Sequence, residues 1–489
     1  MGEKKVRGLL IGATGSGSGK TLVSCGLLEA FRLLEKQAAA FKCGPDYIDP
    51  QFHRQVLGVP SKNLDSWFAE ESLLRRLFLE DAHQADISII EGVMGYYDGL
   101  GGTTTGASTW EVGQALGVPA LLVVGGAGAS VSLGALVKGF LEYRNPPGIR
   151  GIILNQVSPG FYPRIKAFLE EETKVPVYGY LPRLERTPFS SRHLGLVLPD
   201  EIPGIRKTLE ELGRQCLETL DMEGLWKLAE ETRTAPEGAD TLEGETWRPE
   251  KERPCICVAK DAAFSFYYKD NLRLLEKLGA RIRYISLLSD KTLPADAKGL
   301  YLGGGYPELY GQKLEANREM RYAVRAALED GMPCIAECGG FLYLLEKLED
   351  KEGKNWDMAG FLPGRSFFAG KTGRFGYVEL HVKKGGLCGE TGGKIRGHEF
   401  HYMDTDNNGE GFLAEKPAGN RKWVCGHHGA GFYAGFPHLY FYSCPEVAEQ
   451  FVRKAAEYGT GKHTGAKNGE SENTGGTSFG NPCGGKTAG

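Results

Sequence analysis

The chain has 489 residues, enough for two or three domains with full hydrophobic cores. Its formal net charge of −4, without a basic stripe, argues against a nucleic-acid partner. No apolar run approaches the roughly 20 residues that cross a bilayer, the first residues lack a signal-peptide core, and the 11 cysteines form no CxxC pair. We therefore expect a cytoplasmic chain with reduced thiols that acts on small molecules, away from membranes, and that could form a homodimer.

The first 200 residues alternate short apolar runs with segments of helical length. This pattern is typical of a parallel sheet with crossover helices. The expected strands are 6–11, 38–42, 86–91, 120–124, 151–155 and 177–180. The expected helices are 21–34, 70–83, 130–143 and 162–172.

A glycine-rich turn follows the first expected strand. Its sequence, GATGSGSGKT at 12–21, includes Gly15, Gly17 and Gly19 and ends in Lys20 and Thr21. Such a turn before a helix exposes backbone N–H groups that can cradle phosphate oxygens. Lys20 would reach the terminal phosphates and the Thr21 hydroxyl would bind Mg²⁺. A plain turn does not account for Lys-Thr at this point, so the motif predicts a nucleotide site of the P-loop type, in a longer variant.

Carboxylates follow the next two expected strands. Asp46 and Asp49 lie in KCGPDYIDPQFH, 42–53, which we expect to be a loop beside the phosphate site. They could hold Mg²⁺ or orient a substrate, or serve only as turn formers. Glu91 ends its strand beside the P-loop and is a natural second metal ligand. Asp98 opens a glycine- and threonine-rich segment that we expect to cover a ligand.

A second α/β pattern begins near residue 254, after a charged, Pro- and Glu-rich stretch. The expected division is a P-loop domain at 1–225, a linker at 226–253, a second domain at 254–457 and a disordered tail at 458–489. In the first domain, Arg192 and His193 either meet an anionic substrate or lie in a solvated turn.

The stretch PCIAECGGFL, 333–342, predicts a strand, a sharp corner and a new helix. Cys338 stands at this corner, as in a nucleophile elbow. We expect the helix dipole to lower the pKa of Cys338 and make it reactive. A buried structural role suits the other cysteines better than this one.

Taken together, the two halves resemble the cobyrinic acid a,c-diamide synthases, glutamine-dependent amidotransferases of corrin-ring biosynthesis. The resemblance covers almost all of residues 6–455. It is carried, in chain order, by GSGSGKT, FKCGPDYIDPQFH, EGVMGYYDG, LYLGGGYPELY, AECGGFLYL, RGHEFHY and FPHLYF. It implies an α/β fold, with a P-loop parallel-sheet domain like dethiobiotin synthetase followed by a second α/β domain like the class I glutaminases.

The resemblance also implies roles in the second domain. Cys338 matches the glutaminase nucleophile and His438 its general base, while Gly304, Gly305 and Gly339 match the oxyanion region. In the wider class a glutamate follows the histidine by two positions. Here that residue is Tyr440, so what orients His438 is an open question.

In the first domain the resemblance implies an Mg²⁺ site from Thr21, Glu91 and Asp46. It implies contacts with substrate or intermediate from three further side chains; these are Lys42, Asp49 and Asp98. ATP and glutamine would be co-substrates.

The implied reaction amidates the a- and c-side-chain carboxylates of cobyrinic acid through acyl phosphates, with ammonia from glutamine. Ni-sirohydrochlorin and hydrogenobyrinate stay open as alternative substrates. From another class, an ATP-binding regulatory protein with an inert glutaminase-like domain also stays open, although Cys338 and His438 argue against it.

Overall fold

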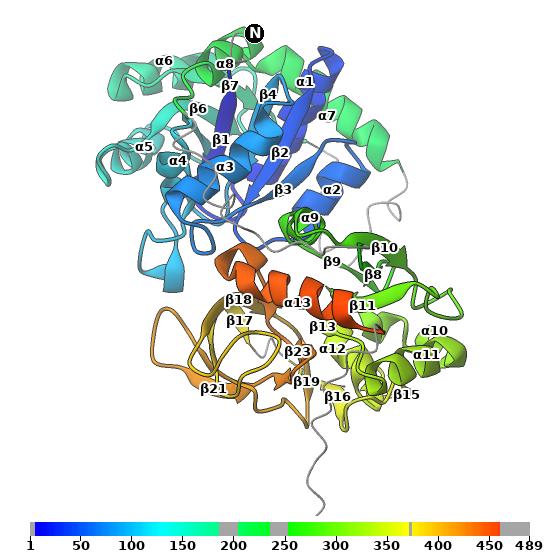
Figure 1. The fold of residues 1–489 in the computed structure, drawn as a ribbon. Helices are drawn as coiled ribbons and strands as arrows, with labels where there is room; N and C mark the ends of the chain where they lie inside the picture. Colours follow the sequence, from blue (N-terminus) through cyan, green and yellow to red (C-terminus); the bar gives the residue numbers. More distant parts are fainter. Residues whose placement is uncertain (1–4, 185–203, 235–252, 371–373, 460–489) are drawn as a thin grey trace, which may run out of the picture.

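A seven-stranded parallel sheet forms the centre of the N-terminal half (Figure 1). The computed structural model describes residues 5–184, 204–234, 253–370 and 374–459. The strand order is β3-β2-β4-β1-β5-β6-β7, and all six neighbouring pairs are parallel. The strands are β1 (Gly8–Ala13), β2 (Ala38–Cys43), β3 (Ser61–Leu64), β4 (Ile87–Glu91), β5 (Ala120–Gly125), β6 (Ile149–Asn155) and β7 (Val177–Leu181).

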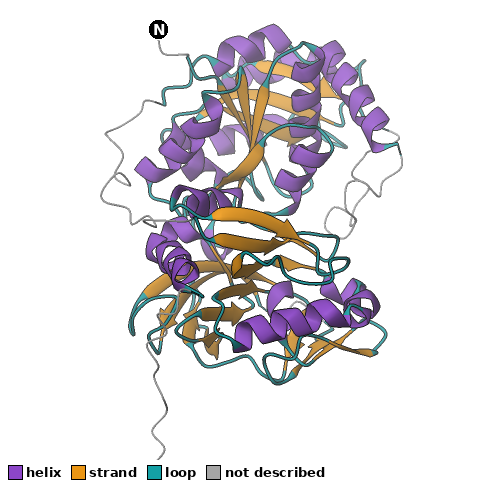
Figure 2. Cartoon of the chain, turned by 45° about the vertical axis from the view of Figure 1, so that its right-hand side comes forward, coloured by secondary structure: helices purple, strands orange, loops and turns teal. Residues whose placement is uncertain are grey.

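Helices cover both faces of this sheet (Figure 2). The two central strands β1 and β4 are therefore buried along their whole length, which explains their nearly continuous apolar sequences, GLLIGA and ISIIE. The helices are α1 (Lys20–Leu33), α2 (Ile48–Gln55), α3 (Glu71–Ala82), α4 (Thr109–Leu116), α5 (Ser132–Glu142), α6 (Tyr162–Thr173), α7 (Ile205–Thr219) and α8 (Met222–Ala229).

Two elements beside β2 are absent from the sequence-based expectation. Helix α2 begins at Ile48, so Asp49 lies in a helix and not in the expected loop. Pro50 is tolerated because it lies in the first turn, where its missing N–H has no intrahelical partner. Strand β3 has the polar sequence SKNL and yet is buried, because Lys62 pairs with carboxylates of neighbouring elements. No apolar run marks either element.

Helix α8 spans the expected boundary between the first domain and the linker. Leu225 and Leu228 of α8 pack into the core under the N-terminal sheet. Beyond the helix, Thr232 accepts a hydrogen bond from the backbone N–H of Gly8 at 3.0 Å. The first part of the expected linker therefore packs against the first half. The segment with Arg192 and His193, residues 235–252 and the tail from 460 lie outside the described residues.

The second half is built on a six-stranded sheet of order β10-β8-β11-β13-β23-β22, parallel except for its last pair. Its strands are β8 (Cys255–Ala259), β10 (Arg281–Ile285), β11 (Ala297–Leu302), β13 (Cys334–Glu337), β22 (His427–His428) and β23 (Phe432–Gly435). Its helices are α9 (Lys269–Lys277), α10 (Gly311–Ala316), α11 (Arg318–Glu329), α12 (Gly339–Leu344) and α13 (Pro445–Glu457).

Smaller sheets complete this half. An antiparallel sheet has the order β21-β20-β17-β18-β24, a four-stranded sheet has the order β15-β14-β16-β19, and β9 pairs with β12. The first sheet contains β17 (Phe375–Val382), β18 (Lys394–Phe400), β20 (Phe412–Glu415), β21 (Lys422–Cys425) and β24 (His438–Leu439). The others contain β9 (Phe264–Phe266), β12 (Gly304–Gly305), β14 (Lys347–Glu349), β15 (Asn355–Asp357), β16 (Arg365–Phe368) and β19 (Met403–Thr405).

The two halves are stacked on one another, with α9 at their boundary (Figure 1). One hydrophobic cluster runs through both halves, and polar contacts join them at its rim. Tyr377 donates to Asp65 Oδ2 at 2.8 Å, and Lys62 donates to Asp270 Oδ1 at 3.2 Å. The carboxyl end of β2 leads into this boundary, so ligands bound at that sheet edge would lie next to the second half.

Candidate active site

The glycine-rich loop between β1 and α1 is shaped for close approach of a ligand. Gly17 and Gly19 have φ values of 79° and 103°, in the left-handed region that favours glycine. A side chain at Gly19 would collide with Asn155, whose Nδ2 donates to Ser18 O at 2.9 Å and holds the loop to the end of β6. A Cβ at Gly15 or Gly17 would meet no atom within 4 Å. The loop is therefore packed against Asn155 at Gly19 and has free space beside Gly15 and Gly17.

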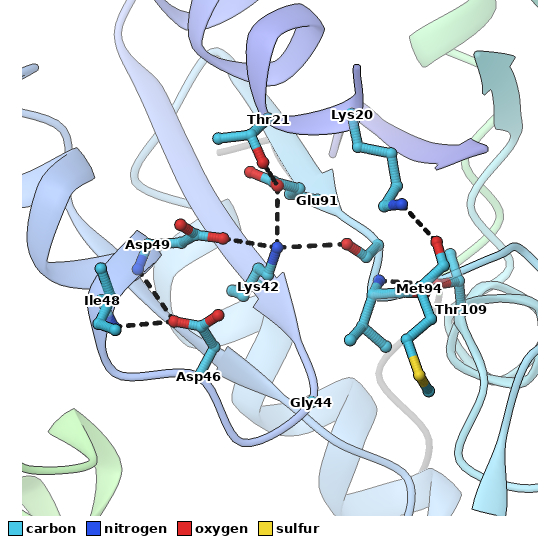
Figure 3. A network of polar contacts seen from close by, with 12 residues as sticks. Lys20, Thr21, Lys42, Gly44, Asp46, Ile48, Asp49, Glu91, Met94 and Thr109 are labelled. Carbon is cyan, nitrogen blue, oxygen red and sulfur yellow. Dashed lines mark hydrogen bonds and ion pairs between the residues drawn. The ribbon is translucent and has the colours of Figure 1, made fainter. Parts of the chain in front are cut away.

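Lys20 and Thr21, the first residues of α1, both lie beside the carboxyl end of β4 (Figure 3). Lys20 Nζ donates to Gly15 O at 3.3 Å and to Met94 O. Burial lowers the pKa of Lys20. Thr21 Oγ1 donates to Glu91 Oε1 at 2.6 Å. The two side chains therefore lie between the glycine-rich loop and the segment that follows β4.

Lys42 is the centre of a buried charged cluster (Figure 3). Its Nζ lies 2.6 Å from Asp49 Oδ2 and 2.8 Å from Glu91 Oε1. Burial alone would lower the pKa of Lys42, but the charges of Asp49 and Glu91 raise it well above its usual value. Lys42 in turn lowers the pKa of Asp49 against the effect of burial. Lys42 and Asp49 are therefore held as an ion pair.

Glu91 has one oxygen free for a further ligand. Its Oε1 accepts from Thr21 and Lys42, whereas Oε2 is buried without a hydrogen bond and lies 3.8 Å from His53 Nε2. Burial lowers the pKa of His53 to about 4, so this imidazole is neutral near pH 7. Burial raises the pKa of Glu91. Within the described ranges no group of three or more His, Cys, Asp or Glu side chains could hold a metal alone. One carboxylate oxygen and one hydroxyl suit Mg²⁺, which usually completes its shell with phosphate and water oxygens.

Asp46 and Asp98 each stabilise a turn. Asp46 Oδ1 accepts from the backbone N–H groups of Ile48 and Asp49 at 2.8 and 3.0 Å, and so caps the start of α2 (Figure 3). Burial raises the pKa of Asp46 to about 6, with the charge of Asp49 adding to the effect. Asp98 Oδ2 accepts from Gly95 N at 2.7 Å. Of the four predicted carboxylates, Glu91 and Asp49 meet at Lys42, while these two are engaged with backbone.

The second site is a sharp corner between β13 and α12. Cys338 has φ 48° and ψ −104°, a strained conformation of the kind found at functional positions. Its backbone N–H donates to Gly435 O at 2.8 Å, and Gly340 N donates to Gly303 O at 2.9 Å. A Cβ on Gly339 would lie only 3.1 Å from Gly305 N. The corner therefore packs closely against the glycines of β12.

His438 reaches the same place from another sheet. It opens β24, where it pairs with His398 of β18, so the antiparallel sheet fixes its position. A Cβ on Gly304 would collide with the Cε1 edge of the His438 ring and lie 3.0 Å from Nε2. The structure thus gathers Cys338, His438 and the predicted oxyanion glycines at one corner.

Comparison with known proteins agrees with both halves of this arrangement. Residues 9–195 match the CobQ/CobB/MinD/ParA nucleotide binding domain, and residues 255–441 match the CobB/CobQ-like glutamine amidotransferase domain. The cobyrinate a,c-diamide synthase of Caldanaerobacter subterraneus subsp. tengcongensis is 36% identical over 458 residues, which cover 93% of this chain and 99% of that protein. The chain belongs to the cobyrinate a,c-diamide synthase family.

Other members of the family are equally similar. The proteins of this name from Priestia megaterium and Salmonella typhimurium are 36% and 37% identical, over 92% and 91% of this chain and 97% of each relative. The resemblance, the α/β fold class and the function of a glutamine-dependent, ATP-driven amidating ligase, all expected from the sequence, are therefore confirmed. In the described part of the chain, no helix has the length and apolar character to cross a membrane.

One expectation for this a,c-diamide synthase family member is wrong. The pKa of Cys338 is not lowered; burial, assisted by the charge of Glu308, raises it to about 12. Helix α12 has only six residues, so its dipole is too weak to offset the loss of solvent around the thiol. Cys338 is therefore a thiol in the resting protein, and any attack by its sulfur would require removal of the proton at that moment.

We expect alkylation of Cys338 by iodoacetamide to be slow at pH 7 and to rise about tenfold per pH unit up to pH 9.5, because the thiolate is the reactive form. The measurement is the labelling rate of the Cys338 peptide by mass spectrometry, with glutathione as the reference thiol. Labelling as fast as that of glutathione at pH 7 would contradict the raised pKa.

Tyr47 is a residue that sequence reasoning passed over. It follows Asp46 in the β2–α2 loop, and its ring centroid lies 4.9 Å from that of the His438 imidazole. It also stacks on Phe266 at 5.4 Å and packs on Tyr268 at 4.7 Å. An aromatic residue between Asp46 and Asp49 was the available signal. Lys42 at the end of β2 lies in the charged cluster and Tyr47 contacts His438, so the segment from Lys42 to Tyr47 touches both sites of this family member.

Asn155 and His53 were also missed. Asn155 Oδ1 and His53 Nε2 are buried without a hydrogen bond, and both residues lie beside the predicted nucleotide and metal positions. His53 is the last residue of the KCGPDYIDPQFH motif but was given no role there, and Asn155 belongs to none of the motifs.

Proposed function

We propose that this chain converts cobyrinate into its a,c-diamide, with ATP activating each carboxylate and glutamine supplying the ammonia. The observation that carries the proposal is the segment from Tyr47 to Asp49, where the β2–α2 loop enters α2. Tyr47 contacts His438, and Asp49 of α2 belongs to the charged cluster at the P-loop. A segment common to both sites suits an enzyme whose two half-reactions must be joined. The naming of full-length relatives as cobyrinate a,c-diamide synthases supports this choice of substrate.

In the first half-reaction a substrate carboxylate oxygen attacks the γ-phosphorus of ATP, and ADP leaves with the electrons of the broken P–O bond. The product is an acyl phosphate, which ammonia attacks; loss of phosphate and a proton leaves the amide. Lys20 would neutralise the charge that develops on the phosphates. Lys42 and Asp49 would orient the carboxylate, and Asp98 would position the segment that covers it.

In the second half-reaction the Cys338 thiol attacks the side-chain amide of glutamine. His438 takes the thiol proton and passes it to the leaving ammonia, so that a thioester forms. Backbone N–H groups near Gly305 and Gly339 would stabilise the oxyanion. Water then attacks the thioester and releases glutamate.

Thr21 and Glu91 would hold Mg²⁺ between the P-loop and β4. The free Oε2 of Glu91 and the adjacent Thr21 hydroxyl support this assignment. The ion would neutralise phosphate charge. Asp46 caps α2 through one oxygen and has the other available, so it is a third candidate ligand. We also propose a cytoplasmic location, which suits the free state of all ten described cysteines.

Replacing Glu91 by glutamine is expected to raise the Mg²⁺ concentration for half-maximal amidation by about tenfold or more, and to weaken ATP use with it, because a carboxylate ligand is lost. Mg²⁺ titrations of ATP hydrolysis with the substrate present measure the effect. Glu171→Gln, at an exposed position of α6, is the matched control. An unchanged Mg²⁺ dependence in Glu91→Gln would remove Glu91 from the metal site.

The direct test offers the purified protein Mg-ATP and glutamine with cobyrinate, hydrogenobyrinate or Ni-sirohydrochlorin, and follows the products by mass. Diamide formed fastest from cobyrinate supports the proposal. Faster conversion of one of the other tetrapyrroles would identify that compound as the substrate instead. Failure to hydrolyse glutamine at all would favour a regulatory protein with an inert second domain.

A further inference from the structure

The residue two positions after His438 does not face the imidazole. Tyr440 OH donates to Asp270 Oδ2 at 3.2 Å, and the other oxygen of Asp270 pairs with Lys62 of the first domain. The Tyr440 ring stacks on Phe68, also from the first domain, with centroids 4.9 Å apart. Tyr440 is therefore committed to the contact between the halves, and His438 needs another partner.

Glu337 occupies the position next to the imidazole. Its Oε2 lies 3.5 Å from His438 Nδ1, and within the described residues it is the one carboxylate less than 4.0 Å from this ring. Both side chains are buried, with exposed fractions of 1% and 3%. His438 Nδ1 has no hydrogen bond otherwise. In the absence of substrate, catalytic hydrogen bonds are often longer than in the reacting complex, so 3.5 Å is within reach of one.

Glu337 is itself held firmly. Its Oε1 accepts from the backbone N–H of Leu439 at 3.0 Å, and its Oε2 accepts from Tyr301 OH at 3.1 Å. Asn271 then fixes the strand that carries the histidine, because it donates to Leu439 O at 2.7 Å and accepts from Phe441 N at 2.8 Å. The carboxylate and the imidazole thus cannot move apart without breaking several buried hydrogen bonds.

The two ends of the imidazole have different neighbours. The Cε1–Nε2 edge lies over Gly304, on the side of the Cys338 corner, whereas Nδ1 faces Glu337. This division suits a general base that takes a proton at Nε2 and is supported at Nδ1. The chain order supports the same assignment. Glu337 is the last residue of β13 and directly precedes Cys338, so the end of one strand positions both the carboxylate and the thiol.

We propose that Glu337 is the positioning residue of the glutaminase, in the role that the wider class gives to the second residue after the histidine. The Glu337 carboxylate accepts from Nδ1–H, selects the tautomer with a free Nε2, and stabilises the imidazolium that forms when His438 takes the Cys338 proton. The inference rests on the proposed glutamine hydrolysis and deepens it. Tyr440, the second residue after the histidine, contacts Asp270 and Phe68 at the interface between the halves instead.

The test compares glutamine hydrolysis by the full chain in Glu337→Gln, Glu337→Asp and Tyr440→Phe. Glutamine is isosteric with the acid and keeps an acceptor for Leu439 N. We expect Glu337→Gln to lower kcat by about 10²–10⁴-fold with KM changed less than about threefold, and Tyr440→Phe to stay within about threefold of the wild type. Glu337→Asp, which retains the charge one methylene further back, should fall between the wild type and Glu337→Gln.

A pH profile separates positioning from a merely structural role. In Glu337→Gln, kcat should keep rising with pH through pH 9, because solvent base must replace the weakened imidazole. Ammonia-dependent amidation should be unchanged, which shows that the chain is folded. If Glu337→Gln does not fold, Glu337→Asp decides, with a loss in kcat at constant KM as the supporting result.

Glu337→Gln with near wild-type kcat, or a larger loss in Tyr440→Phe than in Glu337→Gln, would overturn the inference. An unchanged kcat in Glu337→Asp, where only that variant folds, would overturn it too. A wild-type chain that hydrolyses no glutamine would instead overturn the proposed function, so the two failures are distinguishable.

Discussion

Replacing Cys338 by serine is expected to abolish glutamine-dependent amidation, by at least about 10³-fold, and to leave ammonia-dependent amidation within about twofold of the wild type. A hydroxyl is a far weaker nucleophile than the sulfur it replaces, and no thioester can form. The synthetase site lies in the other half, where the P-loop, Lys42 and Glu91 are untouched. The measurement is amide formation with either nitrogen source.

Cys444→Ser is the matched control, because Cys444 is a partly exposed thiol of the same half outside the corner. It should retain both activities. Cys338→Ser with glutamine-dependent activity near the wild-type level would mean that the corner is not the glutaminase. Loss of ammonia-dependent activity as well would mean that the two halves are coupled more tightly than their separate sites suggest.

The second large effect is expected at Lys20. Lys20→Ala should reduce amidation by about 10²–10⁴-fold with either glutamine or ammonia, because charge on the transferred phosphoryl group is no longer neutralised. Glutamine hydrolysis measured alone should survive within about threefold. Steady-state ADP release and glutamate release from the same preparation separate the two outcomes.

Lys36→Ala provides the comparison, since Lys36 is an exposed lysine just past the end of the same helix. It should behave as the wild type does in both assays. An equal loss of ADP and glutamate release in Lys20→Ala would indicate a folding defect or tight coupling. Normal ADP release would exclude the P-loop as the ATP site.

The two sites lie close together at the contact between the halves, so each variant above is measured in both half-reactions. Tyr47 lies against His438, while Asp49, in the first turn of the helix that follows, pairs with Lys42 beside the P-loop. Ammonia released at the Cys338 corner, as proposed, would therefore start next to the first half. The buried Lys62 pairs both with Asp81 of α3 and with Asp270 of α9, so it joins the two halves.

Local sequence rules were sufficient to predict the glycine-rich loop, the corner at Cys338 and most strands and helices of the N-terminal sheet domain. The P-loop expectation required only glycines, Lys20 and Thr21 between an apolar run and a helical pattern, and α1 indeed begins at Lys20. The corner at Cys338 likewise followed from a short apolar strand and two glycines. These features depend on neighbours within a few residues, so a single sequence contains them.

Features set by distant residues were beyond such rules. Strand β3 has no apolar pattern, because Lys62 is buried by carboxylates from α3 and α9. The Cys338 thiol was expected to have a lowered pKa, yet burial by the surrounding sheets raises it to about 12.

The sequence by itself thus determined the fold class and the family, and it predicted the nucleotide loop and the nucleophile. Only the tertiary structure decided which side chains form hydrogen bonds and ion pairs with the residues of these motifs. Glu337 approaches His438 across 101 positions of sequence, and Lys42 gathers Asp49 and Glu91 from two different elements. Electrostatic and hydrogen-bonding partners depend on distance in space and on the exclusion of water, and neither quantity is encoded by spacing along the chain.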